Sequence, residues 1–479
     1  MKIFKFLIII CLTVFYSCTD KFEDLNTDKK HPSSIPAEPL FTNAAVNLAD
    51  LMNDCSVNTN VFRLYAQYWA QTTYPDESQY NMVTRENPDY IFNTIYRDVL
   101  RDLKECTTIL NKENITNNIA ESERKNKNNL ISILEVFSYA HLVDVFGDVP
   151  YTEALSDATN TPVYDKGADI YASLLIKLDA AINGLDAGFG SFGSADPYYG
   201  GDVAKWKTFA NSLKLRMGMR LADVDDAKAK AIVESCFANV MQNNGESCLI
   251  TYFGAAPNTN PVYENLVLSG RNDFLGANTI IDKMNAMNDP RRSAYFQLSN
   301  DNIYEGGIYG SDNSFSEFSK IGLEFYTPTL SGNMMDYAEV QFLLAEAAAR
   351  GYSVGGTVES YYNNGIKASI NFWGGSDADA SAYTAQASVA YSTAAGDWKQ
   401  KIGTQKWLAL YNNGSEGWTT WRIFDFTGFN TPATLTYDDI PKRMIFPINE
   451  ATLNGANLKL AAARYLGDSP KAKIFWDKF

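Results

Sequence analysis

The feature that most constrains this fold is a succession of long segments whose apolar residues recur at helical spacing. An apolar stripe of this kind is buried by packing against other helices, so the pattern predicts an all-α protein. It is clearest at residues 89–110, 129–146 and 203–222. The same spacing predicts further helices at 40–51, 60–72, 168–185, 337–350, 358–372 and 398–411.

Several predicted helices carry end signals as well. Asp336 followed by Glu339 resembles a capping box, so we expect a helix to begin at Tyr337. Gly351 stands where a left-handed residue would end that helix, and Gly147 does the same after residue 146. These signals fix the boundaries of two central helices.

The arrangement of the helices is predicted by small residues and by the connections. Alanines at 345 and 347–349 let helices approach closely, as in paired-helix repeats, but no clean 34-residue period is present, so any repeat is degenerate. Long connections rich in Gly, Asn and Tyr separate the helices. Connections of this length are usually functional or disordered; they lie at 186–202, 252–276, 301–335 and 411–445.

The N-terminus has the pattern of an export signal. Lys2 and Lys5 precede an apolar run that is too short to span a bilayer, and Ser17-Cys18 follows. We therefore expect residues 1–17 to be a lipoprotein signal peptide and Cys18 to be lipidated, which would anchor the chain. The alternative is an ordinary signal that is cleaved nearby, with Cys18 incidental.

Residues 18–39 are acidic, contain three prolines and carry few apolar side chains. This composition predicts a flexible tether between the anchor and the folded body. A plain disordered N-terminus fits the composition equally well. No linker divides the rest of the chain, so we expect a single domain at 40–479.

Charge and cysteine content exclude several classes of protein. The 479-residue chain has a formal charge of −15, the wrong sign for a nucleic-acid binder or for direct attraction to anionic lipid. After Cys11 and Cys18, only Cys55, Cys106, Cys236 and Cys248 remain, too few for a disulfide framework. Pairing of Cys236 with Cys248 stays open, although buried free thiols are the favoured reading.

Histidine content argues against most catalytic sites. The only two histidines are His31, in the predicted tether, and His141, inside an apolar helix where a core role is expected. A Ser-His-Asp triad or a His-rich zinc site is hard to build from this supply, and we expect no metal and no cofactor. A pair of carboxylates for glycoside hydrolysis stays open by counting; it would be sought at Glu77, Asp273 or Glu305.

Eight strings, in order along the chain, resemble the SusD/RagB family of surface lipoproteins, in particular its SusD-like branch. No single string is decisive, but their common order is specific. One departure follows Trp421, where Arg-Ile-Phe-Asp-Phe-Thr-Gly replaces the paired arginines common in relatives. The strings are Phe22–Asn26, Leu142–Glu153, Lys205–Arg216, Asp289–Arg292, Ala338–Glu346, Tyr361–Ser369, Gln405–Trp407 with Glu416–Trp418, and Arg443–Pro447 with Asn454.

The resemblance implies a fold, a location and a partner. The fold would be four tetratricopeptide-like helix pairs, with long irregular insertions forming the ligand face. The protein would sit on the outer membrane, facing outward, as a hinged lid over a SusC-type TonB-dependent barrel. Family members capture oligosaccharides, some capture peptides instead, and they perform no chemistry. Our residue-based alternatives are a surface glycoside hydrolase and a structural lipoprotein without a small ligand.

Sugar binding requires aromatic faces for stacking and polar groups for the hydroxyls. Aromatic residues make up 13% of the chain, and many lie in the long connections. We expect Tyr65, Tyr68 and Trp69 to be core residues, and Asp289–Arg292 to form ion pairs at a helix end. The candidate ligand-binding residues are Tyr74, Tyr80, Tyr263, Asn265, Arg271 and Tyr326.

Overall fold

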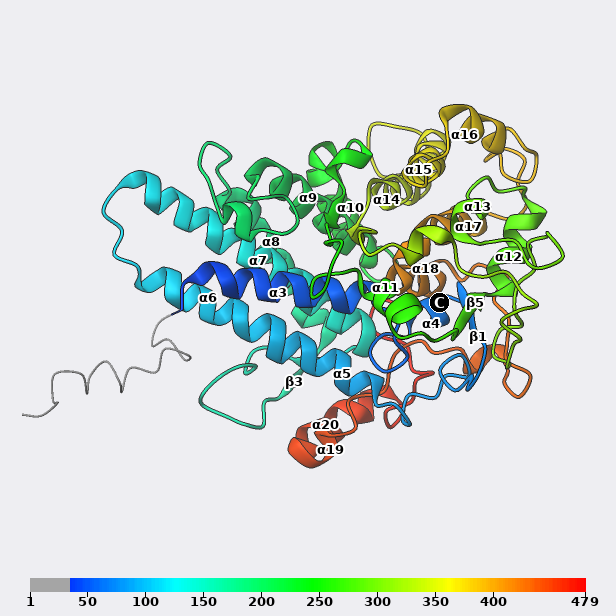
Figure 1. Cartoon of the computed structure of the whole chain (residues 1–479). Coiled ribbons are helices and arrows are strands. Elements are labelled where there is room, and N and C mark those ends of the chain that lie inside the picture. Colours follow the sequence, from blue (N-terminus) through cyan, green and yellow to red (C-terminus); the bar gives the residue numbers. More distant parts are fainter. Residues whose placement is uncertain (1–34) are drawn as a thin grey trace, which may run out of the picture.

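The computed structural model describes residues 35–479, so the signal peptide, Cys18 and most of the predicted tether lie outside the described residues. Helices dominate the structure (Figure 1), which confirms the all-α prediction. Four pairs of neighbouring helices form the scaffold, as the resemblance implied. They are α7 (Asn118–Phe146) with α8 (Gly167–Gly184), α9 (Val203–Arg220) with α10 (Asp226–Cys236), α14 (Tyr337–Ala349) with α15 (Val358–Phe372), and α17 (Trp398–Ala409) with α18 (Gly414–Phe424).

The N-terminal helices pack along the side of this scaffold. Helix α3 (Ala37–Asn53) contacts a continuous helical rod that includes one π-helical stretch. Helix α3 begins at Ala37, three residues before the expected start of the folded body. Ala37 and Phe41 are buried, so the first turn of α3 already belongs to that body. The rod consists of α5 (Asn87–Asn93), η1 (Thr94–Leu100) and α6 (Arg101–Lys112).

The helix-end signals act as predicted at α14. The Asp336 carboxylate accepts a hydrogen bond from the Glu339 backbone N–H at 2.8 Å, which satisfies one of the free donors of the first turn. Gly351 adopts φ +83° after the last turn. The predicted helix at 358–372 coincides with α15, whereas α10 lies in a segment for which no helix was expected.

The helix predicted at 60–72 is wrong for most of its length. Only α4 (Phe62–Tyr65) is helical, and Gln67 then takes a left-handed φ of +56°. The chain continues as strand β1 (Trp69–Gln71), which pairs antiparallel with β5 (Phe274–Gly276). A partner some 200 residues away decided the structure of this segment, and local periodicity cannot report such a partner.

Helix α18 lies inside a stretch predicted to be a loop, and its glycines explain the error. A Cβ on Gly414 would lie 2.6 Å from the Arg63 backbone nitrogen, and one on Gly417 would lie 2.3 Å from the Tyr68 hydroxyl oxygen. Glycine therefore allows α18 to pack directly on α4 and the start of β1. The residues that weaken the helical signal are those that the packing requires.

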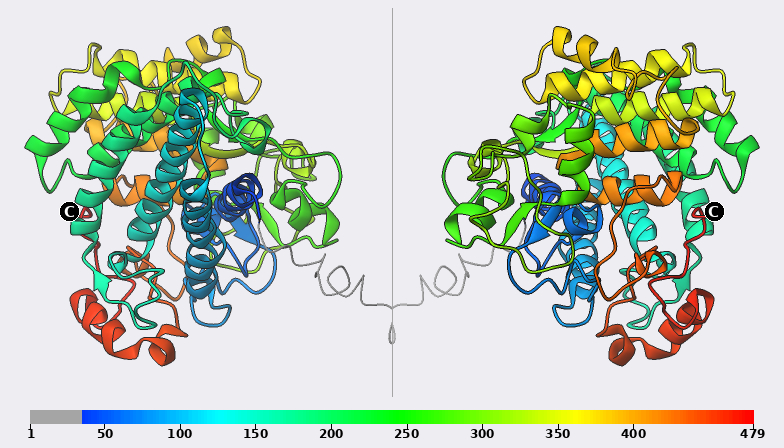
Figure 2. Two further views of the ribbon diagram at one scale, coloured as in Figure 1. Left: turned by 90° about the vertical axis from the view of Figure 1, so that its left-hand side faces the viewer. Right: turned by 90° about the vertical axis from the view of Figure 1, so that its right-hand side faces the viewer.

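The insertion between α10 and α14 carries most of the irregular structure. The α14–α16 region (yellow) and the α19–α20 region (red) lie at opposite ends of the molecule, as Figure 2 shows.

Two further two-stranded sheets are β2 (Val149–Pro150) with β3 (Tyr164–Asp165) and β4 (Cys248–Ile250) with β6 (Gly332–Met335). The remaining helices are α11 (Pro261–Tyr263), η5 (Glu264–Leu268), α12 (Asn278–Ala286), α13 (Arg292–Tyr295), η6 (Leu323–Tyr326), α16 (Asp377–Thr384), α19 (Glu450–Leu453) and α20 (Gly455–Ala462), with short 3-10 turns η2 (Gly193–Ala195), η3 (Phe237–Asn239), η4 (Asn244–Glu246), η7 (Leu410–Asn412), η8 (Tyr437–Asp439) and η9 (Ala463–Tyr465).

A buried network of charges joins the helix pairs. Arg216 on α9 binds Glu339 on α14 through two hydrogen bonds of 2.7 Å. Arg220, one turn on, donates to Glu416 on α18 at 2.5 Å and lies 3.4 Å from the Asp144 carboxylate. All five side chains are at most 9% exposed. The network, which includes Asp144 on α7, therefore links all four pairs to one another from inside the core.

The cysteines and His141 have the core roles expected of them. Cys55, Cys106, Cys236 and Cys248 are buried free thiols, so Cys236 and Cys248 do not pair. Burial lowers the pKa of His141 to about 4, and its Nδ1 lies 3.4 Å from the Ser415 hydroxyl. Among the described residues, α7 alone is long and apolar enough to cross a membrane, but 83% of its most apolar window is buried.

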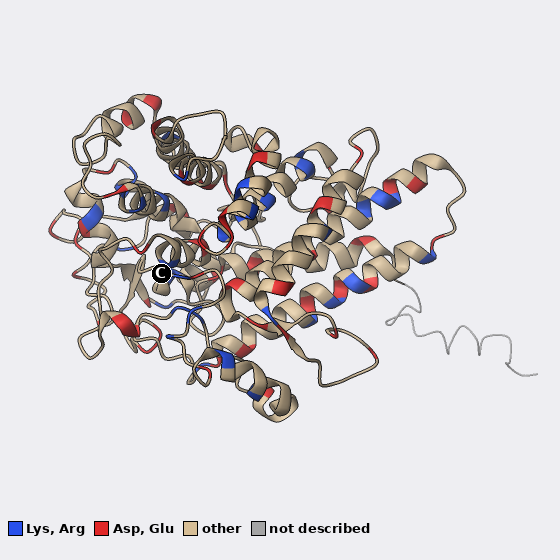
Figure 3. Cartoon of the chain, turned by 180° about the vertical axis from the view of Figure 1, so that it is seen from behind, with Lys and Arg blue, Asp and Glu red and all other residues tan. Residues whose placement is uncertain are grey.

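Charged residues on the long helices are mixed in sign. Seen from behind in Figure 3, Lys and Arg positions alternate with Asp and Glu positions along α6 and α7. Arg124 and Lys125, for example, both lie within ion-pair distance of Glu121. Mixed charge of this kind favours solubility.

Candidate ligand-binding face

The β1–β5 ribbon brings together two of the predicted binding segments. Beyond the last paired residues, the Thr72 backbone N–H donates to the Asp273 carbonyl oxygen at 3.0 Å, and the Thr72 hydroxyl donates to the Asn272 carbonyl at 2.6 Å. The antiparallel register therefore continues past the strand ends, and the segment after β1 lies beside the segment before β5.

This register places Tyr74 and Arg271 at the same end of the ribbon. Tyr74 is 67% exposed and has a left-handed φ of +53°, which turns the chain out of the strand. Arg271 is also exposed, with its guanidinium 2.7 Å from the Asp273 carboxylate. This end of the ribbon therefore carries both an exposed ring suited to stacking and an ion pair with hydrogen-bonding groups.

Three more predicted residues lie around the C-terminal end of α3. Tyr263 on α11 and Tyr326 on η6 are half-buried, and these two elements contact each other. Asn265 donates to the Asp54 carboxylate at 2.8 Å and to the Pro261 carbonyl at 2.9 Å, so its amide N–H groups are already engaged by the protein. Burial raises the pKa of Tyr326 above its usual value.

Tyr80 occupies a more interior position than Tyr74. Its ring packs edge-on against Tyr65 at 5.7 Å between centroids and lies 6.3 Å from Tyr309. Burial raises the pKa of Tyr80 to about 12, and its hydroxyl accepts a hydrogen bond from the Gln67 amide at 3.3 Å. Little of this ring is left to stack on a ligand. Tyr65, Tyr68 and Trp69 are fully buried, which confirms their predicted core role.

Four exposed aromatic rings, one of them the C-terminal Phe479, were not among the predicted binding residues. Phe253 is 62% exposed, while Tyr90 and Tyr437 are each 43% exposed. Phe253 and Tyr437 lie in the long connections expected to carry function, so loop position was an available signal. Tyr90 lies in a helix, and only the structure shows that its ring faces solvent.

One buried amide holds several of these segments together. The Gln67 side-chain oxygen accepts from the Asn430 backbone N–H and from the Thr279 hydroxyl, each at 2.8 Å. Its nitrogen donates to the Asn430 carbonyl at 2.7 Å and to Tyr80. Gln67 is fully buried, so a single side chain joins the link before β1, α12, the 425–435 loop and the Tyr80 turn.

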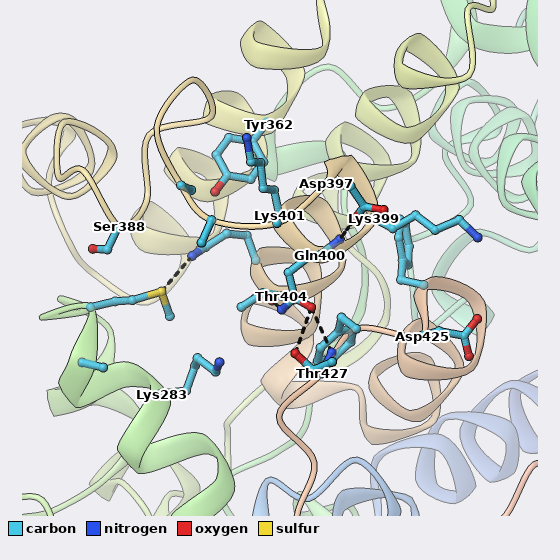
Figure 4. A pocket seen from close by; sticks show the side chains of 18 residues that line it. Lys283, Tyr362, Ser388, Asp397, Lys399, Gln400, Lys401, Thr404, Asp425 and Thr427 are labelled. Atoms are coloured by element: carbon cyan, nitrogen blue, oxygen red, sulfur yellow. Dashed lines mark hydrogen bonds between the residues drawn. The ribbon is translucent and has the colours of Figure 1, made fainter.

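A sizeable hollow lies beside this cluster, not within it. A cavity of about 770 Å³ opens between α12, the start of α17 and the residues after α18. Figure 4 shows Lys283 on one side of it and Asp425 on the other, with Gln400, Thr404 and Thr427 between them. None of the six predicted binding residues lines it.

Comparison with known proteins identifies the fold family. A SusD-like family model, described as "starch-binding associating with outer membrane", matches residues 29–447. The chain belongs to the SusD-like family. A comparison with curated proteins returns no match.

Solved structures agree with this assignment. The SusD-like chain superimposes on a chitin-binding SusD homologue from Flavobacterium johnsoniae with a TM-score of 0.75 and 27% identity, covering 92% of this chain and 97% of that one. A structure described only as a chitin-binding protein gives 0.78 and 25%, covering 92% and 100%. A SusD-like protein from Bacteroides thetaiotaomicron gives 0.77 at 23% identity, covering 92% and 98%, a likeness of fold alone.

Two of the three carboxylates considered for catalysis in this SusD-like protein are engaged in ion pairs, whereas Glu305 is exposed. Glu77 is 1% exposed and binds Arg85 and Gln71, while Asp273 pairs with Arg271. Asp289–Arg292 likewise contains a fully buried ion pair between Asp289 and Arg291. Within residues 35–479, no group of three or more His, Cys, Asp or Glu side chains is placed to hold a metal ion.

Proposed function

We propose that this SusD-like protein binds oligosaccharides at the cell surface and delivers them to a SusC-type TonB-dependent barrel. It would be anchored in the outer membrane by lipid on Cys18, would face outward, and would act as a hinged lid without catalysing a reaction. The observation that carries the proposal is the family match over residues 29–447. The anchor and the barrel are expectations from the same resemblance.

The described surface supports a sugar ligand. Tyr74, Phe253 and Tyr437 present exposed rings, and Arg271 and Asn272 lie at the same end of the β1–β5 ribbon as Tyr74. Rings of this kind stack on the C–H faces of pyranoses, while amide and guanidinium groups bind hydroxyls. Because the two relatives at 25% and 27% identity are described as chitin-binding, oligomers of N-acetylglucosamine are the first ligands to test.

Calorimetry with the full-length chain in detergent tests the proposal. Saturable binding of a glycan, reduced about 5- to 30-fold by Tyr74→Ala, is the expected result, since losing one stacking ring costs roughly 1–2 kcal/mol. Tyr304→Phe is the control, because it removes only a hydroxyl and keeps a ring that packs on the core. If the protein bound peptides but no glycan, the proposed ligand would be a peptide instead. Turnover of a glycoside would contradict the binding role.

A further inference from the structure

Two cavities lie end to end along α12. The larger, of about 770 Å³, and a smaller one of about 250 Å³ share Lys283 and Ala286 in their walls. Together we call them the α12 groove. The larger cavity alone falls within the range of roughly 300–1,000 Å³ that is usual for ligand sites. An elongated hollow of this size suits a chain-like ligand better than a compact one.

The walls of the α12 groove are held in place by hydrogen bonds within the protein. Gln400 on α17 accepts from the Thr427 backbone N–H at 2.9 Å and donates to the Thr404 hydroxyl at 3.1 Å. At the other end, the bonds of Gln67 fix both backbone groups of Asn430. The 425–430 wall is therefore positioned before any ligand arrives, which lowers the entropy cost of binding.

Two hydrogen-bonded residues in the wall of the smaller cavity, Asn278 and Asn430, leave one donor and one acceptor without a partner within residues 35–479. The Asn278 side-chain oxygen accepts from the Tyr309 backbone N–H and from the Asn430 side-chain nitrogen, at 3.2 and 3.0 Å. Within residues 35–479, the Asn278 Nδ2 and the Asn430 Oδ1 take part in no hydrogen bond, and both residues are half-buried. An acetamido group offers the matching pair, one carbonyl oxygen and one N–H.

The charges around the α12 groove favour an uncharged ligand. Lysines and aspartates line it in equal numbers, and several are engaged by the protein: Lys401 donates to the Tyr391 carbonyl, and Asp397 caps α17. The aromatic rings in its wall are at most 2% exposed, so a ligand must be held by hydrogen bonds instead of stacking. The charged residues are Lys283, Lys399, Lys401, Asp282, Asp397 and Asp425.

We propose that the α12 groove is a second binding site, for an uncharged oligosaccharide chain that carries acetamido groups. The proposal rests on the glycan-binding function proposed above. Gln67 hydrogen-bonds both to Tyr80, which follows the exposed Tyr74 turn, and to Asn430 in the groove wall. We expect a chain bound at Tyr74 to extend further units toward this groove wall, so affinity should rise with chain length.

The test compares N-acetylglucosamine trimer and hexamer by calorimetry with the full-length chain in detergent. The decisive variant is Ala286→Trp, because Ala286 is exposed and lies where the two cavities meet. Ala231→Trp on α10 is the matched control, since Ala231 is exposed on a helix and lines neither cavity. Melting temperatures of both variants are measured alongside, to show that each folds.

We expect the hexamer to bind about tenfold more tightly than the trimer, the gain from about two extra hydrogen bonds. Ala286→Trp should remove this gain without changing trimer affinity, and Ala231→Trp should change neither. Equal affinities for both lengths would overturn the groove and leave the proposed function standing, whereas failure of both oligomers to bind would overturn both. An equal gain with a glucose hexamer of the same β-1,4 linkage would overturn the acetamido assignment.

Discussion

Replacing Glu416 by Gln should destabilise the protein strongly, although the two side chains have the same shape. Glu416 accepts a 2.5 Å hydrogen bond from Arg220, and its carboxylate lies 3.9 Å from Arg216. Lys406 is fully buried, and its ammonium has no hydrogen-bond partner within residues 35–479. The substitution would leave these three cations with too little negative charge around them.

The expected cost is about 3–5 kcal/mol, the usual loss when one partner of a buried ion pair is removed. A chain of about 450 residues has an unfolding entropy of roughly 0.9 kcal/mol per kelvin, so the melting temperature should fall by about 3–6 °C. Scanning calorimetry and urea denaturation measure the two quantities. Glu121→Gln, which breaks the partly exposed pair with Arg124 on α7, is the matched control and should cost about 0–1 kcal/mol.

A double variant isolates the cause. Adding Lys406→Met to Glu416→Gln removes one cation as well as one anion, so part of the lost stability should return. A Glu416→Gln variant that melts within about 1 °C of the wild type would refute the reasoning, as would a double variant less stable than the sum of the single changes.

The same carboxylate predicts how stability depends on pH. Burial by itself raises the pKa of Glu416, but the guanidinium groups of Arg220 and Arg216 outweigh it, so the folded-state pKa lies below its ordinary value of 4.5. A group with a lowered folded pKa stabilises the fold above its unfolded pKa, and this contribution is lost as pH falls below it. The difference in melting temperature between wild type and Glu416→Gln should therefore be constant near pH 7 and shrink below about pH 4.5.

Three further predictions concern the ligand face and its support. Tyr74→Ala should weaken glycan binding and leave the melting temperature unchanged. Tyr80→Ala should lower the free energy of unfolding by about 2–4 kcal/mol, because the Tyr80 ring is packed. Equal losses of stability in the two variants would contradict the difference in burial. Gln67→Glu should speed amide hydrogen exchange across residues 426–432 through the loss of its donors, while exchange in α7 stays unchanged as the internal control. Gly417→Ala should destabilise the protein although alanine favours a helix by about 1 kcal/mol, since its Cβ would meet the core. Gly455→Ala, which meets nothing within 4 Å, is the control and should be neutral or stabilising.

The scaffold could be predicted from the sequence because its signals are local. Residues 358–372 carry apolar spacing over four turns, and the structure has α15 there. The Asp336 cap identified the start of α14 to the residue. Local signals failed where a helix depends on a distant partner. Gly414 and Gly417 weaken the helical pattern of α18 in the sequence, although their lack of a side chain is what allows α18 to pack against α4 and β1.

The ligand face was predictable only in part, for a related reason. Residue type and loop position led to Tyr74 and Arg271, which the β1–β5 register places at one end of the ribbon. The same reasoning could not separate the exposed Tyr74 from the packed Tyr80, six residues later. Nor could it find the α12 groove, because Asn278 and Asn430 become neighbours only through the fold.

The candidate ligand-binding face rests directly on the repeat scaffold, and this explains how a face made of loops can be rigid. The Trp407 indole on α17 donates to the Ala66 carbonyl at 2.8 Å, and the Tyr68 hydroxyl donates to the Trp407 carbonyl at 2.5 Å. Arg63 in turn donates to the Tyr411 carbonyl at 3.0 Å. These bonds hold the segment before β1 against α17. The hydrogen bonds of Gln67 then connect this segment to the outer loops. Substitution of a surface residue such as Tyr74 should therefore alter ligand binding without altering the fold.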